Sequence, residues 1–165
     1  MTAERGGCRH TDRTRSRRAG RRLALAALFE ADFGQRTAQA ILERHLEETE
    51  RDPEAAALAR TVVDAVVANR DRIDALIEQT APQYPVVQLA RMDRALLRGA
   101  VGEVLHSPTP ARVAIAEWVE LARIYSGDPM RRLVNGVLGK IATDPSARKT
   151  APPPISEEGV SGHDL

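Results

Sequence analysis

Three arginines near the start of the chain have a helical spacing that would let them bind phosphate groups together. Arg18, Arg21 and Arg22 stand at positions i, i+3 and i+4, so in a helix they share one face. An apolar series continues the same face at i+7, i+10 and i+11: Leu25, Leu28 and Phe29. The planar guanidinium group of arginine donates paired hydrogen bonds to phosphate oxygens, which indicates an RNA or DNA backbone as ligand. Burial of the apolar half of the helix would fix the direction of the arginine half.

A second pair of arginines, Arg131 and Arg132, follows Pro129 at the expected start of a later helix. Cations near a helix N-terminus face the positive end of the helix dipole and cost about 0.3–1 kcal/mol each. A local cost without visible compensation is typical of a functional site, and two arginine-bearing helix starts could converge on one ligand. The alternative is that all these arginines are solvated surface charges, and their spacing leaves both interpretations open.

The net charge of +1 hides an asymmetry along the chain. Residues 1–22 contain eight arginines and two carboxylates, whereas the remainder is acidic overall. This pattern favours an anionic partner for the N-terminal segment and a basic partner for the body.

The residue sets that mark common active sites are missing from the sequence. It contains no glycine-rich phosphate loop, no zinc-type spacing of Cys and His, and no nucleophile elbow. Cys8 is the only cysteine, which precludes an intramolecular disulfide and is compatible with a reducing cytoplasm. Glu117 and Glu120 lie three apart, but Arg123 follows Glu120 by three residues, so surface pairing explains them. We therefore expect no catalysis, no metal and no cofactor.

Abundant Ala and Leu, few aromatic residues and helical spacing of the apolar positions predict an all-α protein. Residues 1–16 are predicted to form a disordered basic arm, 17–142 one folded domain, and 143–165 a disordered tail. Prolines, glycines and capping residues divide the domain into seven expected helices. These cover about 17–33, 37–50, 53–69, 71–79, 89–106, 111–125 and 129–142.

Several residues within these helices have structural interpretations. His45 lies on a mostly apolar face and is expected to be packed in the core. Gly136 and Gly139 each cost about 1 kcal/mol relative to Ala inside a helix, which close packing against a neighbouring helix would explain. Three charged residues interrupt the helix over 89–106, and either structural pairing or a protein interface accounts for them: Asp93, Arg94 and Arg98.

Four segments together resemble the NusB family of bacterial transcription antitermination factors, which are all-helical proteins that bind the boxA element of RNA. The segments are RRAGRRLALAALF at 17–29, MDRALLR at 92–98, VAIAEWVELAR at 113–123 and LVNGVLGK at 133–140. The resemblance covers about residues 17–142. It implies a NusB-like helical bundle of two subdomains, a three-helix N-terminal part and a C-terminal bundle.

The resemblance also implies partners and sites. In the family, the arginine-rich first helix and the start of the last helix bind RNA, and another surface binds NusE, a small-subunit ribosomal protein. Asp93 occupies a position of that NusE surface. The candidate RNA-binding residues are Arg17, Arg18, Arg21, Arg22, Phe29, Arg132 and Leu133. The expected protein is a bacterial cytoplasmic factor, monomeric or homodimeric, that acts on the transcription elongation complex during ribosomal RNA synthesis.

The sequence departs from the family pattern at three positions. Leu133 replaces a usual aromatic residue, Ala26 a common Gln, and Gly102 a frequent aromatic residue before Glu103. Loss of an aromatic residue removes a stacking platform that stabilises by roughly 1–3 kcal/mol per base. Two other interpretations stay open: a helical protein-interaction module, and an RNA-binding accessory related to the NusB-like domain of ribosomal RNA cytosine methyltransferases.

Overall fold

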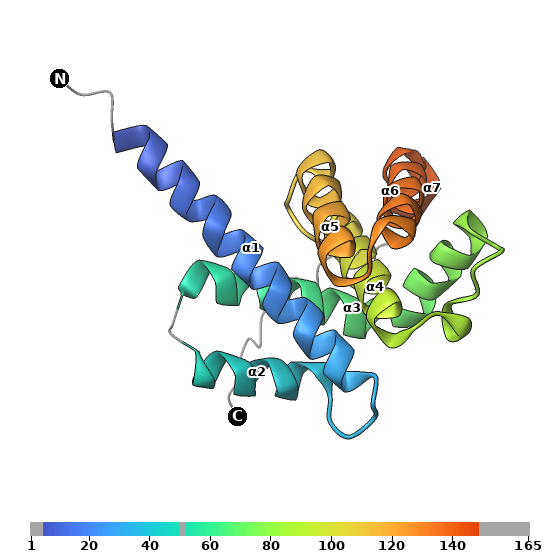
Figure 1. The fold of residues 1–165 in the computed structure, drawn as a ribbon, viewed down its shortest axis with the longest axis horizontal. Helices are drawn as coiled ribbons and strands as arrows, with labels where there is room; N and C mark the ends of the chain where they lie inside the picture. Colours follow the sequence, from blue (N-terminus) through green and yellow to red (C-terminus); the bar gives the residue numbers. More distant parts are fainter. Residues whose placement is uncertain (1–4, 50–51, 149–165) are drawn as a thin grey trace, which may run out of the picture.

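A computed structural model describes residues 5–49 and 52–148, and this part of the chain is an assembly of α-helices (Figure 1). The all-α prediction is confirmed, with seven α-helices and one short 3-10 helix in the described residues. The elements are α1 (Arg5–Ala31), α2 (Ala38–Glu48), α3 (Pro53–Thr80), η1 (Val86–Gln88), α4 (Arg91–His106), α5 (Ala111–Tyr125), α6 (Asp128–Thr143) and α7 (Pro145–Arg148). None of the described helices is both long and apolar enough to cross a membrane.

Side-chain caps start two of the described helices, α2 and α3, at the positions that the sequence predicts. The side chain of Thr37 accepts a hydrogen bond from the backbone N–H of Ala40 at 3.2 Å and starts α2. Asp52 accepts backbone hydrogen bonds at 3.1 and 3.2 Å at the start of α3, where Pro53 takes the first helical position. Gly127 has a φ of 106°, which allows the sharp turn between α5 and α6.

The two helices expected over 53–69 and 71–79 are one helix, α3, with a kink at Asn69. The backbone of Asn69 has φ −126° and ψ 20°, and its side-chain amide donates to the carbonyl of Ala65 at 2.8 Å. A side chain that bonds the preceding turn competes with the helical ladder and bends it, but no proline stops the chain here. The helix therefore changes direction without ending.

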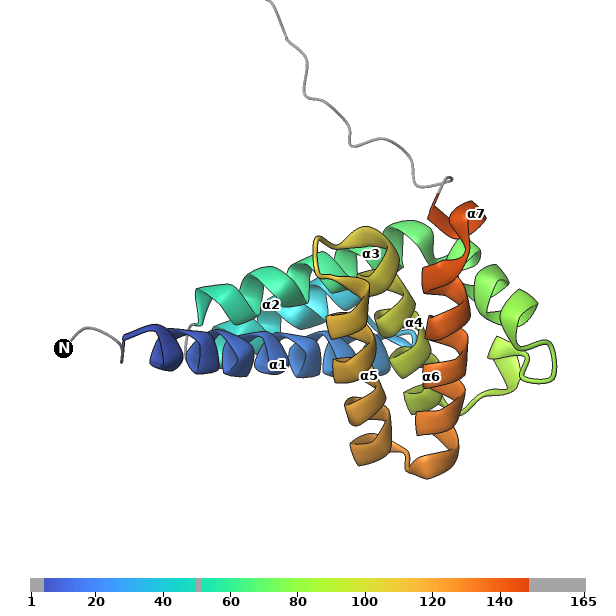
Figure 2. The same cartoon turned by 90° about the horizontal axis from the view of Figure 1, so that it is seen from above.

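The helices form two groups around one continuous core. Helices α1, α2 and α3 pack together in one group, α4 packs against α1 and α3, and α5 and α6 pack against α4 and against each other (Figures 1 and 2). Buried apolar residues from both groups form a single cluster. Trp118 in α5 is its largest fully buried side chain.

Helix α1 begins at Arg5 and not near Arg17, so the prediction of a disordered arm is wrong for residues 5–16. The segment lacks apolar residues, which is why the sequence predicts disorder. A helix already formed by its buried half extends at low cost, and polar contacts with the start of α3 hold this extension. At the other end, α7 falls within the expected tail, and residues 1–4 and 149–165 lie outside the described residues.

Close helix packing occurs at glycines other than those expected. A Cβ atom added to Gly99 would lie 2.6 Å from Cη2 of Trp118, and one on Gly102 would lie 2.9 Å from a methyl group of Val66. Gly136 and Gly139 are instead exposed, with no atom within 4 Å of an added Cβ. The packing interpretation of these two glycines is wrong, because they lie on the side of α6 that faces away from the core.

Candidate nucleic-acid interface

Helix α1 carries two different stripes, and the three arginines of the N-terminal cluster are divided between them. Arg21 lies three and seven residues before Ala24 and Leu28, both buried, and it continues their stripe into the core. Arg18 and Arg22 lie eleven and seven residues before Phe29, on the side of α1 that solvent reaches. Helical spacing alone groups all three arginines, but the packing separates Arg21 from the others.

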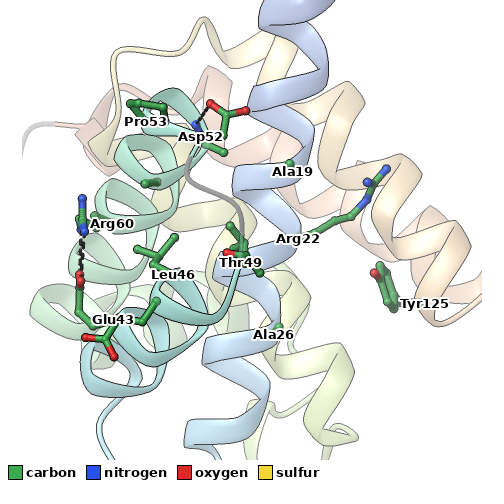
Figure 3. Close-up of a pocket in the computed structure, with 14 residues that line it drawn as sticks. Ala19, Arg22, Ala26, Glu43, Leu46, Thr49, Asp52, Pro53, Arg60 and Tyr125 are labelled. Carbon is green, nitrogen blue, oxygen red and sulfur yellow. Dashed lines mark hydrogen bonds and ion pairs between the residues drawn. The ribbon is translucent and has the colours of Figure 1, made fainter.

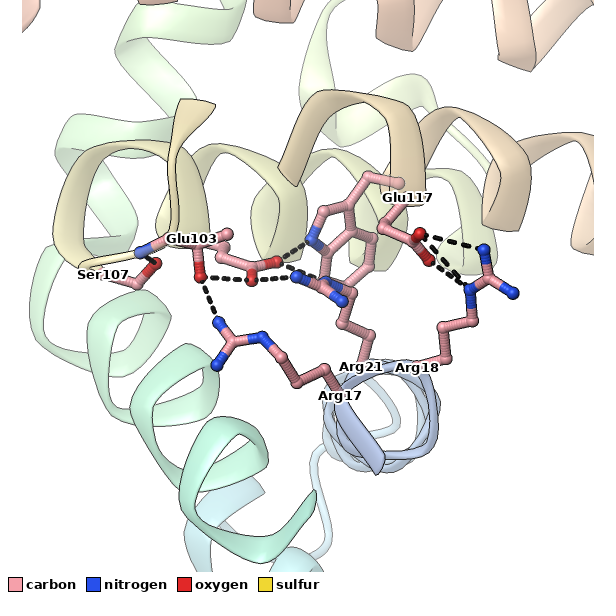
Figure 4. Close-up of polar contacts among 8 residues, drawn as sticks. Arg17, Arg18, Arg21, Glu103, Ser107 and Glu117 are labelled. Carbon is pink, nitrogen blue, oxygen red and sulfur yellow. Dashed lines mark hydrogen bonds and ion pairs between the residues drawn. The ribbon is translucent and has the colours of Figure 1, made fainter. Parts of the chain in front are cut away.

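Arg21 is fully buried and is bound to Glu103 of α4 (Figure 4). Its Nε and Nη2 atoms donate to the two carboxylate oxygens at 2.9 and 2.8 Å. The same carboxylate accepts hydrogen bonds from Thr109 Oγ1 at 3.1 Å and from Trp118 Nε1 at 2.5 Å. Only 2% of the Arg21 side chain is exposed, so the prediction that Arg21 contacts RNA is not supported by its position. We reassign it to the core, where it offsets the buried charge of Glu103.

Arg17 is half-buried at the edge of the same network. Its Nη2 atom donates to Thr109 Oγ1 at 2.7 Å, and that hydroxyl in turn donates to Glu103. Arg17 therefore ties α1 to the loop between α4 and α5, and its guanidinium points toward that loop and away from the exposed stripe (Figure 4).

Arg18 is exposed and forms an ion pair with Glu117 of α5 (Figure 4). The guanidinium group donates to the carboxylate at 2.9, 3.2 and 3.3 Å. This hydrogen bond and the charge of Glu117 raise the pKa of Arg18. Because 56% of the Arg18 side chain is exposed, a phosphate group can reach the guanidinium and compete with the carboxylate.

Arg22 is exposed and has no ion-pair partner in the part of the chain that the structure describes. It extends from α1 toward the side where Tyr125 lies, at the C-terminal end of α5 (Figure 3). Both residues line a groove of about 810 Å³ between α1, α2 and the start of α3. Ala26 also lines this groove.

An apolar hollow of about 390 Å³ lies next to Arg22 and gathers three of the five aromatic residues of the chain. The rings of Phe29 and Phe33 meet edge to face, with centroids 5.4 Å apart. Tyr125 lines the same hollow, and Phe33 and Tyr125 are 52% and 45% exposed. The guanidinium carbon of Arg91 lies 4.3 Å from the centre of the Phe33 ring. Aromatic rings beside cations suit a partner that carries both flat bases and phosphates.

Sequence reasoning predicts Phe29 but misses Phe33, Tyr125 and Arg91. These three residues come from a turn after α1, the end of α5 and the start of α4. The sequence contains only five Phe, Trp and Tyr residues, so each of them can be considered individually as a candidate for base stacking. Their meeting point depends on the tertiary structure.

The remaining predicted residues lie near the starts of α4 and α6. Arg132 is exposed in the first turns of α6, and Leu133 is half-buried against the core. Asp93, in the first turn of α4, accepts a hydrogen bond from Ser126 Oγ at 2.6 Å. Helix α6 begins three residues after Tyr125, which lines the same hollow as Arg22.

The other charged residues mostly stabilise the fold. Arg94 binds Asp32 at 2.6 Å and Arg98 binds Asp74 at 2.9 Å, which confirms structural pairing for these two arginines. Arg123 pairs with Glu120 on the surface, as the spacing predicts. His45 is half-buried, not fully buried, with its Nε2 atom 3.0 Å from Glu30. In the described residues no three His, Cys, Asp or Glu side chains gather in a way that could hold a metal ion.

Comparison with known proteins identifies the family. A sequence model of the NusB family matches residues 18–143. The chain belongs to the NusB family. The NusB protein of Dehalococcoides mccartyi strain 195, described as a transcription antitermination protein, is 39% identical over 130 residues, which are 78% of this chain and 91% of that protein. The NusB protein of Symbiobacterium thermophilum, with the same description, is 42% identical over 135 residues, 76% of this chain and 88% of that protein.

Solved NusB structures have the same fold. The structure of T. maritima NusB matches with a TM-score of 0.71 and 33% identity, covering 78% of this chain and 91% of that one. A structure of the antitermination factors NusB and NusE in complex with double-stranded RNA matches with a TM-score of 0.68 and 27% identity, covering 78% and 96%. These similarities favour the antitermination interpretation over a helical interaction module or a methyltransferase accessory.

Proposed function

We propose that this NusB-family protein binds boxA-type single-stranded RNA together with NusE, and so acts as a transcription antitermination factor on ribosomal RNA operons. The observation that carries the proposal is the exposed stripe of α1, where Arg18 and Arg22 lead into the hollow lined by Phe29, Phe33 and Tyr125. The solved complex of NusB, NusE and double-stranded RNA supports this choice of partners. The site of action is the elongation complex in the bacterial cytoplasm.

The exposed arginines supply affinity through the RNA backbone. Arg22 faces solvent without an ion-pair partner among the described residues, so no ion pair among them has to break when it binds phosphate. Arg18 exchanges the Glu117 carboxylate for a phosphate, and exposed ion pairs of this kind stabilise by only about 0–1 kcal/mol. Both groups are therefore available to a polyanion.

The aromatic hollow supplies base contacts that phosphate pairing alone does not give. Unstacked bases of single-stranded RNA lie against aromatic rings, and each stacked base contributes roughly 1–3 kcal/mol. Phe33 and Tyr125 have the exposure that this contact needs. In this proposal they take over part of the role of the aromatic residue that Leu133 replaces.

A second surface binds NusE in this proposal, and Asp93 belongs to it. The carboxylate of Asp93 is held by Ser126 and is partly exposed, in the first turn of α4. A basic partner would pair with it, in agreement with the acidic charge of the chain outside residues 1–22. Arg132 extends the RNA contact onto the start of α6, and Leu133 lies beside it.

Fluorescence anisotropy of a labelled boxA-type RNA tests the proposal, with a scrambled RNA and with or without NusE. The test variant is Arg18→Ala/Arg22→Ala, because Arg21 is a core residue whose loss would disturb the fold. The control, Arg36→Ala/Arg70→Ala, removes two exposed arginines elsewhere and changes the net charge equally. We expect selective binding that NusE strengthens and that only the test variant loses.

The salt dependence of the same measurement reports how many phosphates are bound. For three or four phosphates on a single strand, log K should fall with log salt with a slope of about −2 to −3. Equal and weak binding of both RNAs, unchanged by NusE or by the test variant, would contradict the proposal. Light scattering on the free protein then decides whether it is a dimer, the state in which Arg18 and Arg22 could be covered.

A further inference from the structure

Helix α1 extends toward the N-terminus beyond the region that matches the NusB family model. One side of this extension contacts α3, and the opposite side is exposed to solvent. The family match starts at residue 18, whereas α1 starts at Arg5. Figure 2 shows this part of α1 running out past α5, beside the start of α3. Side chains seven residues apart on a helix return to nearly the same side, so each side of the extension has a defined direction.

One side of the extension is attached to the start of α3. Arg13 Nε lies 2.8 Å from Glu54 Oε1, and a hydrogen bond from Ser16 is the main reason that the pKa of Asp52 is lowered. One turn further along, Gly20 lies so close to Ala55 that an added Cβ would be 2.6 Å from its carbonyl oxygen. These contacts fix the rotation of α1 about its own axis.

The opposite side carries Arg15, which is exposed and has no ion-pair partner in the described part of the chain. Arg15 precedes Arg18 and Arg22 by three and seven residues, so the three guanidinium groups form one row along the helix. Together with Thr14 and His10 they line a shallow hollow of about 350 Å³. The row from Arg15 to Arg22 is about 10 Å long, since a helix rises 1.5 Å per residue.

We infer that Arg15 adds a further phosphate contact to the RNA-binding row, beyond the part of the protein that the family model covers. This inference rests on the proposed function, because it assigns Arg15 to the same ligand as Arg18 and Arg22. Arg13 and Ser16 attach the extension to the start of α3. This attachment holds Arg15 in line with Arg18 and Arg22 in the free protein. The RNA strand follows α1 toward its N-terminus over this additional turn.

The experiment compares the full-length chain with Arg15→Ala on two RNAs, a minimal boxA-type RNA and the same RNA lengthened by six nucleotides at each end. Loss of one single-strand phosphate contact reduces the salt slope by about 0.7. Between 50 and 200 mM salt the affinity advantage of the wild type over Arg15→Ala should therefore shrink by about 2.6-fold on the long RNA. The charge control is Arg70→Ala, which removes an exposed arginine from α3 and leaves α1 intact.

A second variant tests the attachment itself. Arg13→Ala breaks the ion pair with Glu54 and keeps Arg15, so it should also weaken binding of the long RNA if the attachment holds Arg15 in line, and far-ultraviolet circular dichroism reports whether α1 keeps its helicity. If Arg15→Ala and Arg70→Ala give the same slope as the wild type while Arg18→Ala/Arg22→Ala loses binding, the inference about Arg15 is overturned and the proposed function stands. If the wild type itself fails to select the boxA-type RNA, the proposed function fails and the inference fails with it.

Discussion

Arg21 and Glu103, 82 positions apart in the chain, form a buried ion pair joined by two hydrogen bonds of 2.9 and 2.8 Å. The pair connects α1 to α4, and Trp118 Nε1 connects the same carboxylate to α5. Three helices thus meet at one buried charge. The same contact removes Arg21 from the surface and leaves Arg18 and Arg22 as the exposed members of the cluster.

The Arg21→Met variant should be strongly destabilised, because it leaves the Glu103 carboxylate buried without its counter-charge. Breaking one partner of a buried pair typically costs about 3–5 kcal/mol. Urea denaturation would measure the free energy of unfolding. The double variant Arg21→Met/Glu103→Gln should lose less than the sum of the two single variants, and strict additivity would show that the two side chains do not interact.

The Gly99→Ala variant should lose about 1–3 kcal/mol of stability, since its new methyl group would lie 2.6 Å from the buried ring of Trp118. Gly136→Ala is the matched control, because the same change there meets open space in the middle of a helix. The control should gain about 0.5–1 kcal/mol from higher helix propensity. Thermal and urea unfolding of both variants would check this, and an equal effect at the two sites would contradict it.

Stability should fall below about pH 6.5 because of His106. Burial, and secondly the charge of Arg72, lower the pKa of His106 below its ordinary value of 6.5, and its Nε2 atom is buried without a hydrogen-bond partner. The unfolded chain therefore binds a proton more readily than the folded one, so the free energy of unfolding declines as the pH falls from 6.5 through the folded-state pKa.

Urea midpoints measured from pH 8 to 5 would test this pH dependence. His106→Gln should flatten the decline, whereas His10→Gln, at an exposed position of α1, should leave it unchanged. Parallel curves for the wild type and His106→Gln would assign the pH dependence to other groups.

The Glu117→Gln variant should bind RNA more tightly, by up to about fivefold at low salt. The Glu117 carboxylate holds Arg18 at 2.9 Å in the free protein and competes with phosphate, and exposed pairs of this kind are worth about 0–1 kcal/mol. Asp64→Asn makes the same change in net charge at an exposed position of α3. RNA anisotropy should rank Glu117→Gln above Asp64→Asn; weaker binding by Glu117→Gln would mean that the carboxylate orients Arg18 for RNA.

The sequence by itself determined the class of fold and several of the helix boundaries. Helical spacing of Ala, Leu and Val predicts the helices because burial of one face is a local periodic property. Thr37, Asp52 and Gly127 set helix boundaries through contacts or backbone angles within a few residues. The arginine cluster and the family motifs also predict an anionic partner, because charge and motif spacing are visible without the fold.

Only the tertiary structure decided which of these residues face solvent. Spacing places Arg18, Arg21 and Arg22 on one side of a helix, but the rotation of α1 against Glu103 buries the second and exposes the other two. Gly99 and Gly136 look alike in sequence, yet one lies against Trp118 and the other against open space. Phe29 and Tyr125 line one hollow although 96 positions separate them. Such relationships depend on long-range packing between helices, which local spacing does not encode.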